Sequence, residues 1–276
     1  MPPILCPHCR RLISSDEPRC PHCGLHAPGM RFRRALLGWL QPGPRELVRG
    51  LITVNVVWFG LSLLVDPAGL GGSLNPLAFL SPSDRGLFLM GATGSLPVLR
   101  LGRWWTLLAA NFLHGGLLHI FFNMAALAQI GPFVAREYGT ARFVALYLLT
   151  GAAGFLVSVL AGVGLTIGAS ASLLGLIGAA MYYGKARGGV YGEAVFRQMW
   201  GWTVGIFLFG FLLPGINNWA HGGGLAAGFI LGHLLGFREQ RPEAPWHRAL
   251  ALGLAGLTAL SLLWGVAGVV AWRLGG

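Results

Sequence analysis

Charged residues are scarce in this chain, and those present are grouped. They make up 11% of the 276 residues, whereas soluble domains carry about 25%. None occurs in residues 143–184, 198–237 or 249–272. A bilayer is crossed by about 20 apolar residues, so the first two ranges are each long enough for two helices. This shortage of charge excludes an ordinary soluble domain and predicts a multi-pass helical membrane protein.

Cysteine is absent after residue 23, which leaves the apolar part of the chain without a disulfide. A C-x2-C turn presents two sulfurs to one ion, and four thiolates suit tetrahedral zinc. The spacing therefore predicts a structural Zn²⁺ site in a module that resembles a zinc ribbon, with a redox CxxC pair as the alternative. The expected ligands are Cys6, Cys9, Cys20 and Cys23.

The first residues also lack the basic and apolar segments of a cleavable signal peptide. We therefore expect a cytoplasmic amino terminus, where thiols stay reduced. The predicted domains are a zinc-ribbon-like cytoplasmic module at 1–30, a basic linker at 31–46 and a membrane domain at 47–273. The net charge of +11 is assigned to helix ends on the cytoplasmic side, so we expect contact with the lipid bilayer and not with nucleic acid.

Seven spanning helices are predicted, which makes the fold an all-α polytopic bundle. They are expected at about 47–65, 105–134, 143–162, 167–184, 198–213, 218–237 and 249–272. The connections after the second, fourth and sixth helices carry the charges, and those near 163–167 and 214–218 carry none. The positive-inside rule then places the neutral connections outside, in what we take to be the cell (inner) membrane.

Ser170 opens the fourth predicted span and His221 opens the sixth. Gly224, Gly228 and Gly232 follow His221 at i+3, i+7 and i+11, so these residues share one face of a helix. Small residues on one face let two membrane helices approach closely. The pattern predicts that the Ser170 hydroxyl and the His221 imidazole meet, as a serine nucleophile and its base require.

The second predicted span holds His114, His119 and Asn123 but no carboxylate. His119 and Asn123 are separated by four residues and face the same way, and two converging donors suit a developing oxyanion. Ser170 near the start of its helix adds a free backbone N–H. His114 lies on another face, where we expect it to brace the loop.

Three motifs occur here in a recognisable order. They are H-x4-H-x3-N at 114–123, G-x-S at 168–170 and A-H-x2-G-x3-G at 220–228. In this order the chain resembles the rhomboid family of intramembrane serine proteases over about residues 46–272, and the seventh helix matches the six-plus-one form of that family.

The resemblance implies a serine endopeptidase with Ser170 as nucleophile, His221 as general base and an oxyanion site at His119 and Asn123. It implies no cofactor for catalysis. The substrates would be transmembrane segments of single-pass or multi-pass membrane proteins, cleaved at a site toward the outer side. We also expect a cytoplasmic partner for the zinc module.

Three positions depart from the family pattern. Thr106 stands where the family commonly has the Arg of a Trp-Arg pair, so the first loop must be held in another way. Leu174 replaces an aromatic residue that packs on the catalytic histidine, and Ala171 replaces a glycine.

The alternatives belong to other functional classes. A catalytically inactive rhomboid-like protein that binds membrane clients would typically lack the serine or the histidine, and this chain has both. A transporter or channel would place ionisable groups or broken helices along a pathway. In the simplest alternative, Ser170 only packs against a neighbouring helix, and His221 is a polar side chain whose hydrogen bonds serve the structure alone.

Overall fold

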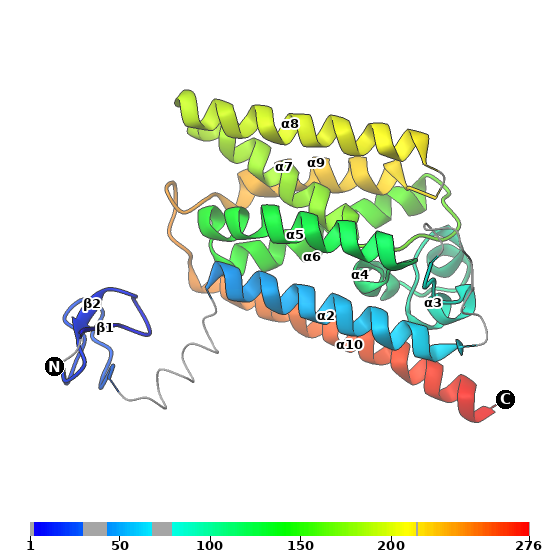
Figure 1. The fold of residues 1–276 in the computed structure, drawn as a ribbon, viewed down its shortest axis with the longest axis horizontal. Coiled ribbons are helices and arrows are strands. Elements are labelled where there is room, and N and C mark those ends of the chain that lie inside the picture. The colour runs from blue at the N-terminus through cyan, green and yellow to red at the C-terminus, as the bar shows by residue number, and fades with distance from the viewer. Residues whose placement is uncertain (1–2, 30–42, 68–78, 214, 276) are drawn as a thin grey trace. The chain divides into compact units, whose positions relative to one another are not determined.

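The computed structural model describes residues 3–29, 43–67, 79–213 and 215–275. The chain folds as two compact units, Met1–Leu47 and Val48–Gly276 (Figure 1). The basic linker predicted at 31–46 lies largely outside the described residues. The second unit is helical, as the shortage of charge predicted.

The first unit contains two copies of one turn. The strands β1 (Pro3–Leu5) and β2 (Leu12–Ser14) pair antiparallel around the first copy. The backbone N–H of Cys6 donates to the Arg11 carbonyl, and that of Cys20 donates to the Leu25 carbonyl, both at 2.9 Å. Two further matched hydrogen bonds close the turns at the carbonyls of Cys6 and Cys20. The repeated C-x2-C spacing therefore produces a repeated backbone conformation.

The second unit contains seven helices of 18 residues or more among its described residues. They are α2 (Pro44–Val65), α5 (Leu117–Tyr138), α6 (Thr140–Leu160), α7 (Ser170–Arg187), α8 (Gly189–Leu212), α9 (Asn218–Leu235) and α10 (Pro245–Gly275). Shorter helices lie between α2 and α5, namely α3 (Asp84–Met90), η3 (Leu96–Arg100), α4 (Thr106–Ala109) and η4 (Ala110–Phe112). The predicted bundle of seven helices, preceded in the sequence by a four-cysteine module, is confirmed.

The continuous helix predicted at 105–134 is wrong in its first third. The chain there forms α4 and η4, leaves helical structure at Leu113–Gly116, and begins α5 only at Leu117. Hydropathy does not reveal this break, because the segment is apolar like the span that follows it. In the structure, Leu113 and His114 are buried in protein. Non-helical backbone at membrane depth is tolerated where protein surrounds it.

Helix α7 is the centre of the bundle. Of its 18 residues, 13 are buried, and it packs against α6, α8 and most extensively α9. Among the described residues, five helices are long and apolar enough to cross a membrane: α2, α5, α6, α8 and α10. Helices α7 and α9 have 18 residues each, about 27 Å at 1.5 Å per residue, and they contain many small and polar residues.

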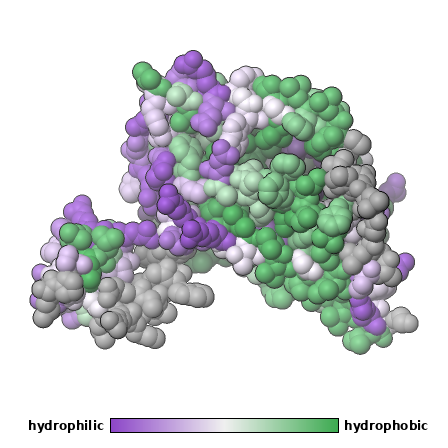
Figure 2. Space-filling view, in the orientation of Figure 1, coloured by the Kyte–Doolittle hydropathy of each residue, from purple (hydrophilic) through white to green (hydrophobic). Residues whose placement is uncertain are grey.

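The surface of the helical unit agrees with a membrane environment. Figure 2 shows apolar residues over most of the visible face and hydrophilic ones gathered at the end where α7 passes to α8. Two exposed ion pairs, Arg136–Glu137 and Arg187–Glu239, belong to this charged end. The chain is therefore a multi-pass membrane protein whose charges gather where helices end.

Arg142 connects α6 to the chain before α10. Its side chain is fully buried, and all its guanidinium nitrogens donate hydrogen bonds. The acceptors are the carbonyls of Tyr138, Arg241 and Pro242 and Nε2 of His247, at 2.9–3.2 Å. Glu243 Oε1 accepts from the backbone N–H groups of Ala141 and Arg142, at the start of α6, at 2.9 and 3.2 Å. We call these contacts the Arg142 clamp.

We expect Arg142→Ala to destabilise the bundle by about 3 kcal/mol, because it leaves a cavity and several buried carbonyls without donors. Thermal unfolding in detergent measures the effect. The matched control is Arg136→Ala, since the Arg136 side chain is 61% exposed and forms an exposed ion pair with the adjacent Glu137; surface pairs of this kind contribute little. Equal melting temperatures for the two variants would contradict a structural role of the clamp.

Candidate functional site

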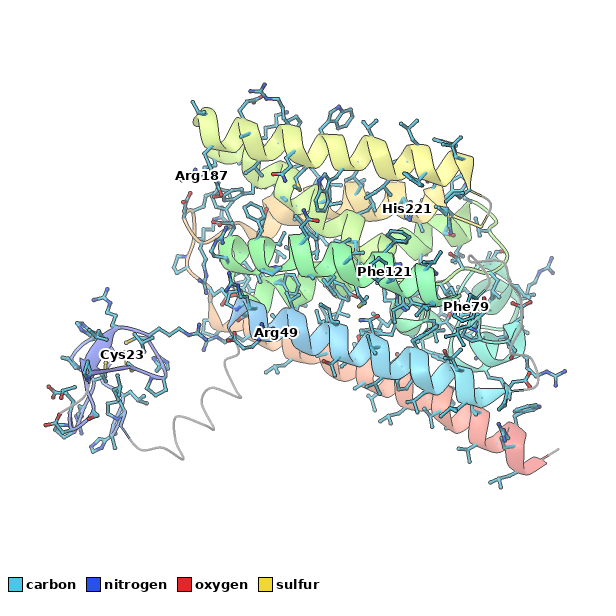
Figure 3. The ribbon with its side chains drawn as sticks, viewed as in Figure 1. Cys23, Arg49, Phe79, Phe121, Arg187 and His221 are labelled. Atoms are coloured by element: carbon cyan, nitrogen blue, oxygen red, sulfur yellow. The ribbon has the colours of Figure 1, made fainter. Side chains whose placement is uncertain are left out.

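Ser170 and His221 lie within hydrogen-bond distance. His221 Nε2 is 2.9 Å from Ser170 Oγ, although the residues are separated by 51 positions. Ser170 is the first residue of α7, and His221 is in the first turn of α9. Figure 3 places His221 toward the end of the bundle opposite Arg187. The structure therefore brings the two residues together at one depth, away from the charged end.

Close packing of α7 on α9 makes this distance possible. His221, Gly224, Gly228 and Gly232 are all buried, so the face that their spacing predicts is the buried face of α9. A Cβ atom on Gly224 would collide with the carbonyl oxygen of Ala171, and one on Gly228 with that of Gly175. Glycine is thus required at both positions if the helices are to stay at this separation.

His119 lies beside the serine. A Cβ atom on Gly168 would be 2.8 Å from His119 Nε2 and 3.8 Å from Ser170 Oγ, so both groups border this glycine. Gly168 has φ +121°, a conformation that L side chains rarely adopt. His119 Nδ1 accepts from the backbone N–H of Gly115 at 3.2 Å. The neutral ring therefore carries its proton on Nε2, the atom that borders Gly168.

Asn123 and His114 are placed differently. Asn123 is buried, and its amide donates to the His119 carbonyl at 2.8 Å, which leaves the second N–H of the amide for another acceptor. His114 is fully buried, with its ring edge-on to His119 at 5.2 Å between centroids. It contacts the neighbouring histidine and not the serine, in the non-helical segment before α5.

His221 has no carboxylate partner in the part of the chain that the structure describes. Its Nδ1 atom is buried and has no hydrogen-bond partner there. The arrangement is accordingly a serine and a histidine without a third hydrogen-bonded residue.

The family model described as the Rhomboid domain matches residues 101–238, which is half of the chain and contains Ser170, His221, His119 and Asn123. The chain belongs to the rhomboid family. The chain is 35% identical to RHOMBOID-like protein 4 of Arabidopsis thaliana over 207 residues, 71% of this chain and 52% of that protein.

Two further relatives are named as proteases. Rhomboid protease GluP of Bacillus subtilis is 34% identical over 140 residues, 49% of this chain and 27% of that protein. Rhomboid-like protease 1 of Toxoplasma gondii is 31% identical over 169 residues, 57% of each chain. The chain spans about half the length of the first curated relatives it matches.

Arg103 provides contacts between α3 and the segment just before α4 (Thr106–Ala109), the stretch of this rhomboid for which a different means of support was expected. The Arg103 guanidinium lies over the rings of Phe88 and Trp105, at 4.4 and 4.9 Å from their centroids, and donates to the Leu89 carbonyl at 3.3 Å. Burial lowers the pKa of Arg103. A guanidinium three residues before Thr106 therefore provides contacts to this stretch.

An aromatic ring on another helix lies against the histidine. Phe207 of α8 is edge-on to His221, with 6.2 Å between ring centroids, whereas Leu174 is buried within the bundle. The ring that packs on the imidazole therefore comes from α8 and not from position 174. The sequence contains no signal for this contact, because the face of α8 that meets α9 depends on the tertiary packing.

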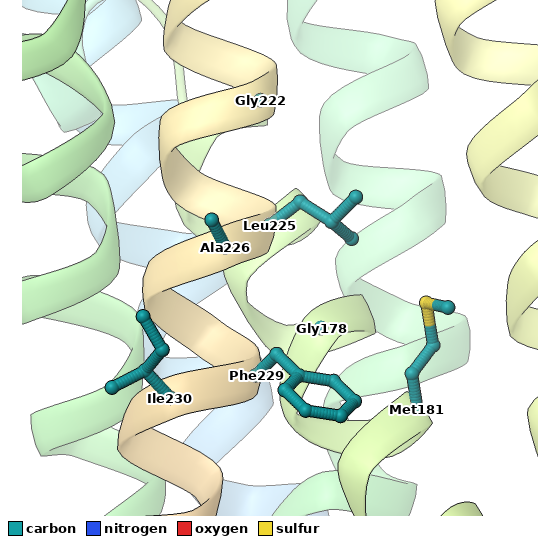
Figure 4. A pocket seen from close by; sticks show the side chains of 7 residues that line it. All are labelled: Gly178, Met181, Gly222, Leu225, Ala226, Phe229 and Ile230. Atoms are coloured by element: carbon teal, nitrogen blue, oxygen red, sulfur yellow. The ribbon is translucent and has the colours of Figure 1, made fainter.

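An apolar groove lies farther along the same two helices. Gly178, Met181, Leu225, Phe229 and Ile230 are among the residues that line a cavity of about 320 Å³ (Figure 4). Gly178 follows Ser170 by eight residues, or about 12 Å along α7. Neither Ser170 nor His221 lines this groove.

The four cysteines form the candidate metal centre. Their sulfur atoms all lie within 4.8 Å of one another. Cys6 Sγ is 3.7 Å from Cys23 Sγ, and Cys9 Sγ is 3.6 Å from Cys20 Sγ. Tetrahedral bonds of about 2.3 Å to one zinc ion require sulfurs about 3.8 Å apart, so the residues fit the metal.

The thiols of the second C-x2-C turn, or knuckle, are shifted in opposite directions. Burial acts to raise the pKa of Cys20, but backbone hydrogen bonds from His22 and Cys23, together with hydrogen bonds from the neighbouring thiols, lower it to about 7. A backbone hydrogen bond from Leu25 acts to lower the pKa of Cys23, but burial and the neighbouring cysteines raise it. The thiolate is the form that binds metal. These four residues can therefore hold a metal ion.

Proposed function

We propose that this chain is an intramembrane serine endopeptidase that cleaves transmembrane segments of other membrane proteins. The observation that carries the proposal is the 2.9 Å distance between Ser170 Oγ and His221 Nε2. Membership of a family with named proteases supports the class of reaction. A pair buried merely for packing does not require a donor such as His119 beside it.

In the proposed mechanism, His221 Nε2 takes the proton of the Ser170 hydroxyl while Oγ attacks the scissile carbonyl carbon. The carbonyl oxygen becomes an oxyanion, next to the Ser170 N–H, the His119 Nε2–H and the free N–H of Asn123. When the intermediate collapses, His221 returns the proton to the leaving amine and an acyl-enzyme remains. Water activated by the same imidazole then hydrolyses the ester.

The position of the site supports the substrate class. Ser170 and His221 each lie in the first turn of a bundle helix and are half-buried and 5% exposed, respectively. A substrate must therefore bring its peptide bond into the bundle, as a segment that unwinds readily from a membrane helix can. We place this end of the bundle on the outer side of the cell membrane, because most of the charged residues lie toward the opposite end.

The test is incubation of the purified full chain in proteoliposomes with a single-pass membrane protein that carries a small residue within its transmembrane segment. We expect two products, whose new termini, read by mass spectrometry, fall inside that segment. Cleavage restricted to the flanking soluble regions, or no cleavage of a panel of such substrates, would overturn the proposal and leave a client-binding rhomboid.

We also propose that the four cysteines bind one structural Zn²⁺ and that the module docks a cytoplasmic partner. We expect metal analysis to find about one zinc per chain, and none in Cys6→Ser/Cys20→Ser, because each knuckle then retains one thiolate. Labelling of Ser170 by a fluorophosphonate should be unchanged in this variant, since no part of the proposed mechanism uses the metal. Full zinc content in the double variant would contradict the assignment.

A further inference from the structure

Asn217 forms hydrogen bonds with the first turn of α9, which carries His221. It is the N-cap of the helix, and its Oδ1 accepts from the backbone N–H groups of Trp219 and Ala220, both at 3.1 Å. The Asn217 carbonyl accepts from the backbone N–H of His221 itself, also at 3.1 Å. Capping of this kind fixes the otherwise unpaired donors of a helix start.

The other end of the same amide reaches the segment before Ser170. Asn217 Nδ2 donates to Thr166 Oγ1 at 3.0 Å and to Ser158 Oγ, at the end of α6, at 2.5 Å. Thr166 is itself fixed by two backbone hydrogen bonds with Thr93, at 2.6 and 3.1 Å. Asn217 therefore ties the start of α9 to chain that is already held in place.

Two side-chain contacts join these segments, and they lie at equivalent positions along the chain. Thr166 precedes Ser170 by four residues, and Asn217 precedes His221 by four. One connection is the bond between the amide and the threonine hydroxyl, and the other is the contact between the serine and the histidine. Movement of the first turn of α9 would lengthen both together.

We propose that Asn217 is a positioning residue for the endopeptidase reaction, and that its amide sets the separation of Ser170 Oγ and His221 Nε2 by tying α9 to Thr166 and Ser158. This inference rests on the proposed function, because it concerns the same two reacting groups. The glycine contacts hold α9 from Gly224 onward, and the Asn217 amide holds the turn before them, where the helix has no other cap.

The experiment measures cleavage of one transmembrane substrate by the full chain in proteoliposomes. We expect Asn217→Ala to lower kcat by about tenfold or more with little change in KM, because a misplacement of about 1 Å is enough for such a loss. Asn217→Asp should restore most of kcat, since a carboxylate accepts from the same backbone amides and from the two hydroxyls. Thr166→Val, which removes one acceptor at nearly constant shape, should reduce kcat several-fold.

Ser83→Ala is the matched control. Ser83 is the N-cap of α3 and accepts from the Gly86 N–H at 3.0 Å, so this variant loses a cap without a connection to Ser170 or His221. Its kcat should equal that of the parent. If Asn217→Ala cleaves as fast as the parent, or if Ser83→Ala is equally slow, the positioning role is excluded. A parent that cleaves nothing removes the proposed function and this inference with it.

Discussion

Replacement of Ser170 by alanine should abolish cleavage of a transmembrane substrate, with a fall in rate of about 10⁴-fold or more. Removing a serine nucleophile leaves only the binding and oxyanion contributions, which are small by comparison. Ser170→Ala deletes one hydroxyl at the start of α7 and adds nothing that the half-buried site must accommodate. The protein should therefore stay folded, with an unchanged melting temperature in detergent.

A fluorophosphonate reports on the serine independently of any substrate. We expect one label per parent chain on the peptide containing Ser170, and none on Ser170→Ala. Ser172→Ala is a suitable companion, because Ser172 is two residues away but fully buried and within 2.7 Å of Asn111 Oδ1 and 2.6 Å of the Tyr147 carbonyl. Labelling that persists in Ser170→Ala, or that disappears in Ser172→Ala alone, would exclude Ser170 as the nucleophile.

Replacement of Gly224 by alanine should have the second-largest effect on activity. The added methyl group would lie 2.2 Å from the Ala171 carbonyl oxygen, next to Ser170, so α7 and α9 must move apart. Overpacking typically destabilises by about 1–3 kcal/mol. The hydrogen bond between Ser170 and His221 lies one turn away, and a shift of about 1 Å there should reduce the rate of cleavage about 100-fold.

Gly222→Ala on the same helix is the control for this result. A Cβ atom on Gly222 meets nothing closer than the Phe207 ring, at 3.9 Å, which is ordinary van der Waals contact. Both variants lose the same backbone freedom, so propensity effects cancel and only the contact with α7 differs. Similar rates for Gly222→Ala and Gly224→Ala would show that close packing at Gly224 does not set the geometry of the pair.

The features that could be predicted from the sequence are those that depend on the spacing of residues close together in the chain. The C-x2-C repeat predicts the two similar turns because each turn is formed by five or six consecutive residues. The interval from His221 to Gly232 predicts the buried face of α9, because helical periodicity alone decides which residues share a face. The scarcity of charge predicts the bundle, since a bilayer excludes most other folds.

The features that could not be predicted depend on contacts between distant segments. The break before α5 occurs in an apolar stretch and is stabilised by surrounding protein. Phe207 meets His221, and Asn217 meets Thr166, only because α6, α8 and α9 pack in one particular way. Sequence periodicity assigns these residues to helices or loops but does not indicate which neighbours they acquire.

The Arg142 clamp bears on the order in which the bundle assembles. Arg142 leaves the ribosome about 100 residues before the carbonyls of Arg241 and Pro242 that accept its hydrogen bonds. Until those residues emerge, an unpaired guanidinium must remain hydrated at the membrane surface, because burial without partners is strongly unfavourable. The amino-terminal end of α6 can therefore settle into its final place only after translation has passed the turn leading into α10.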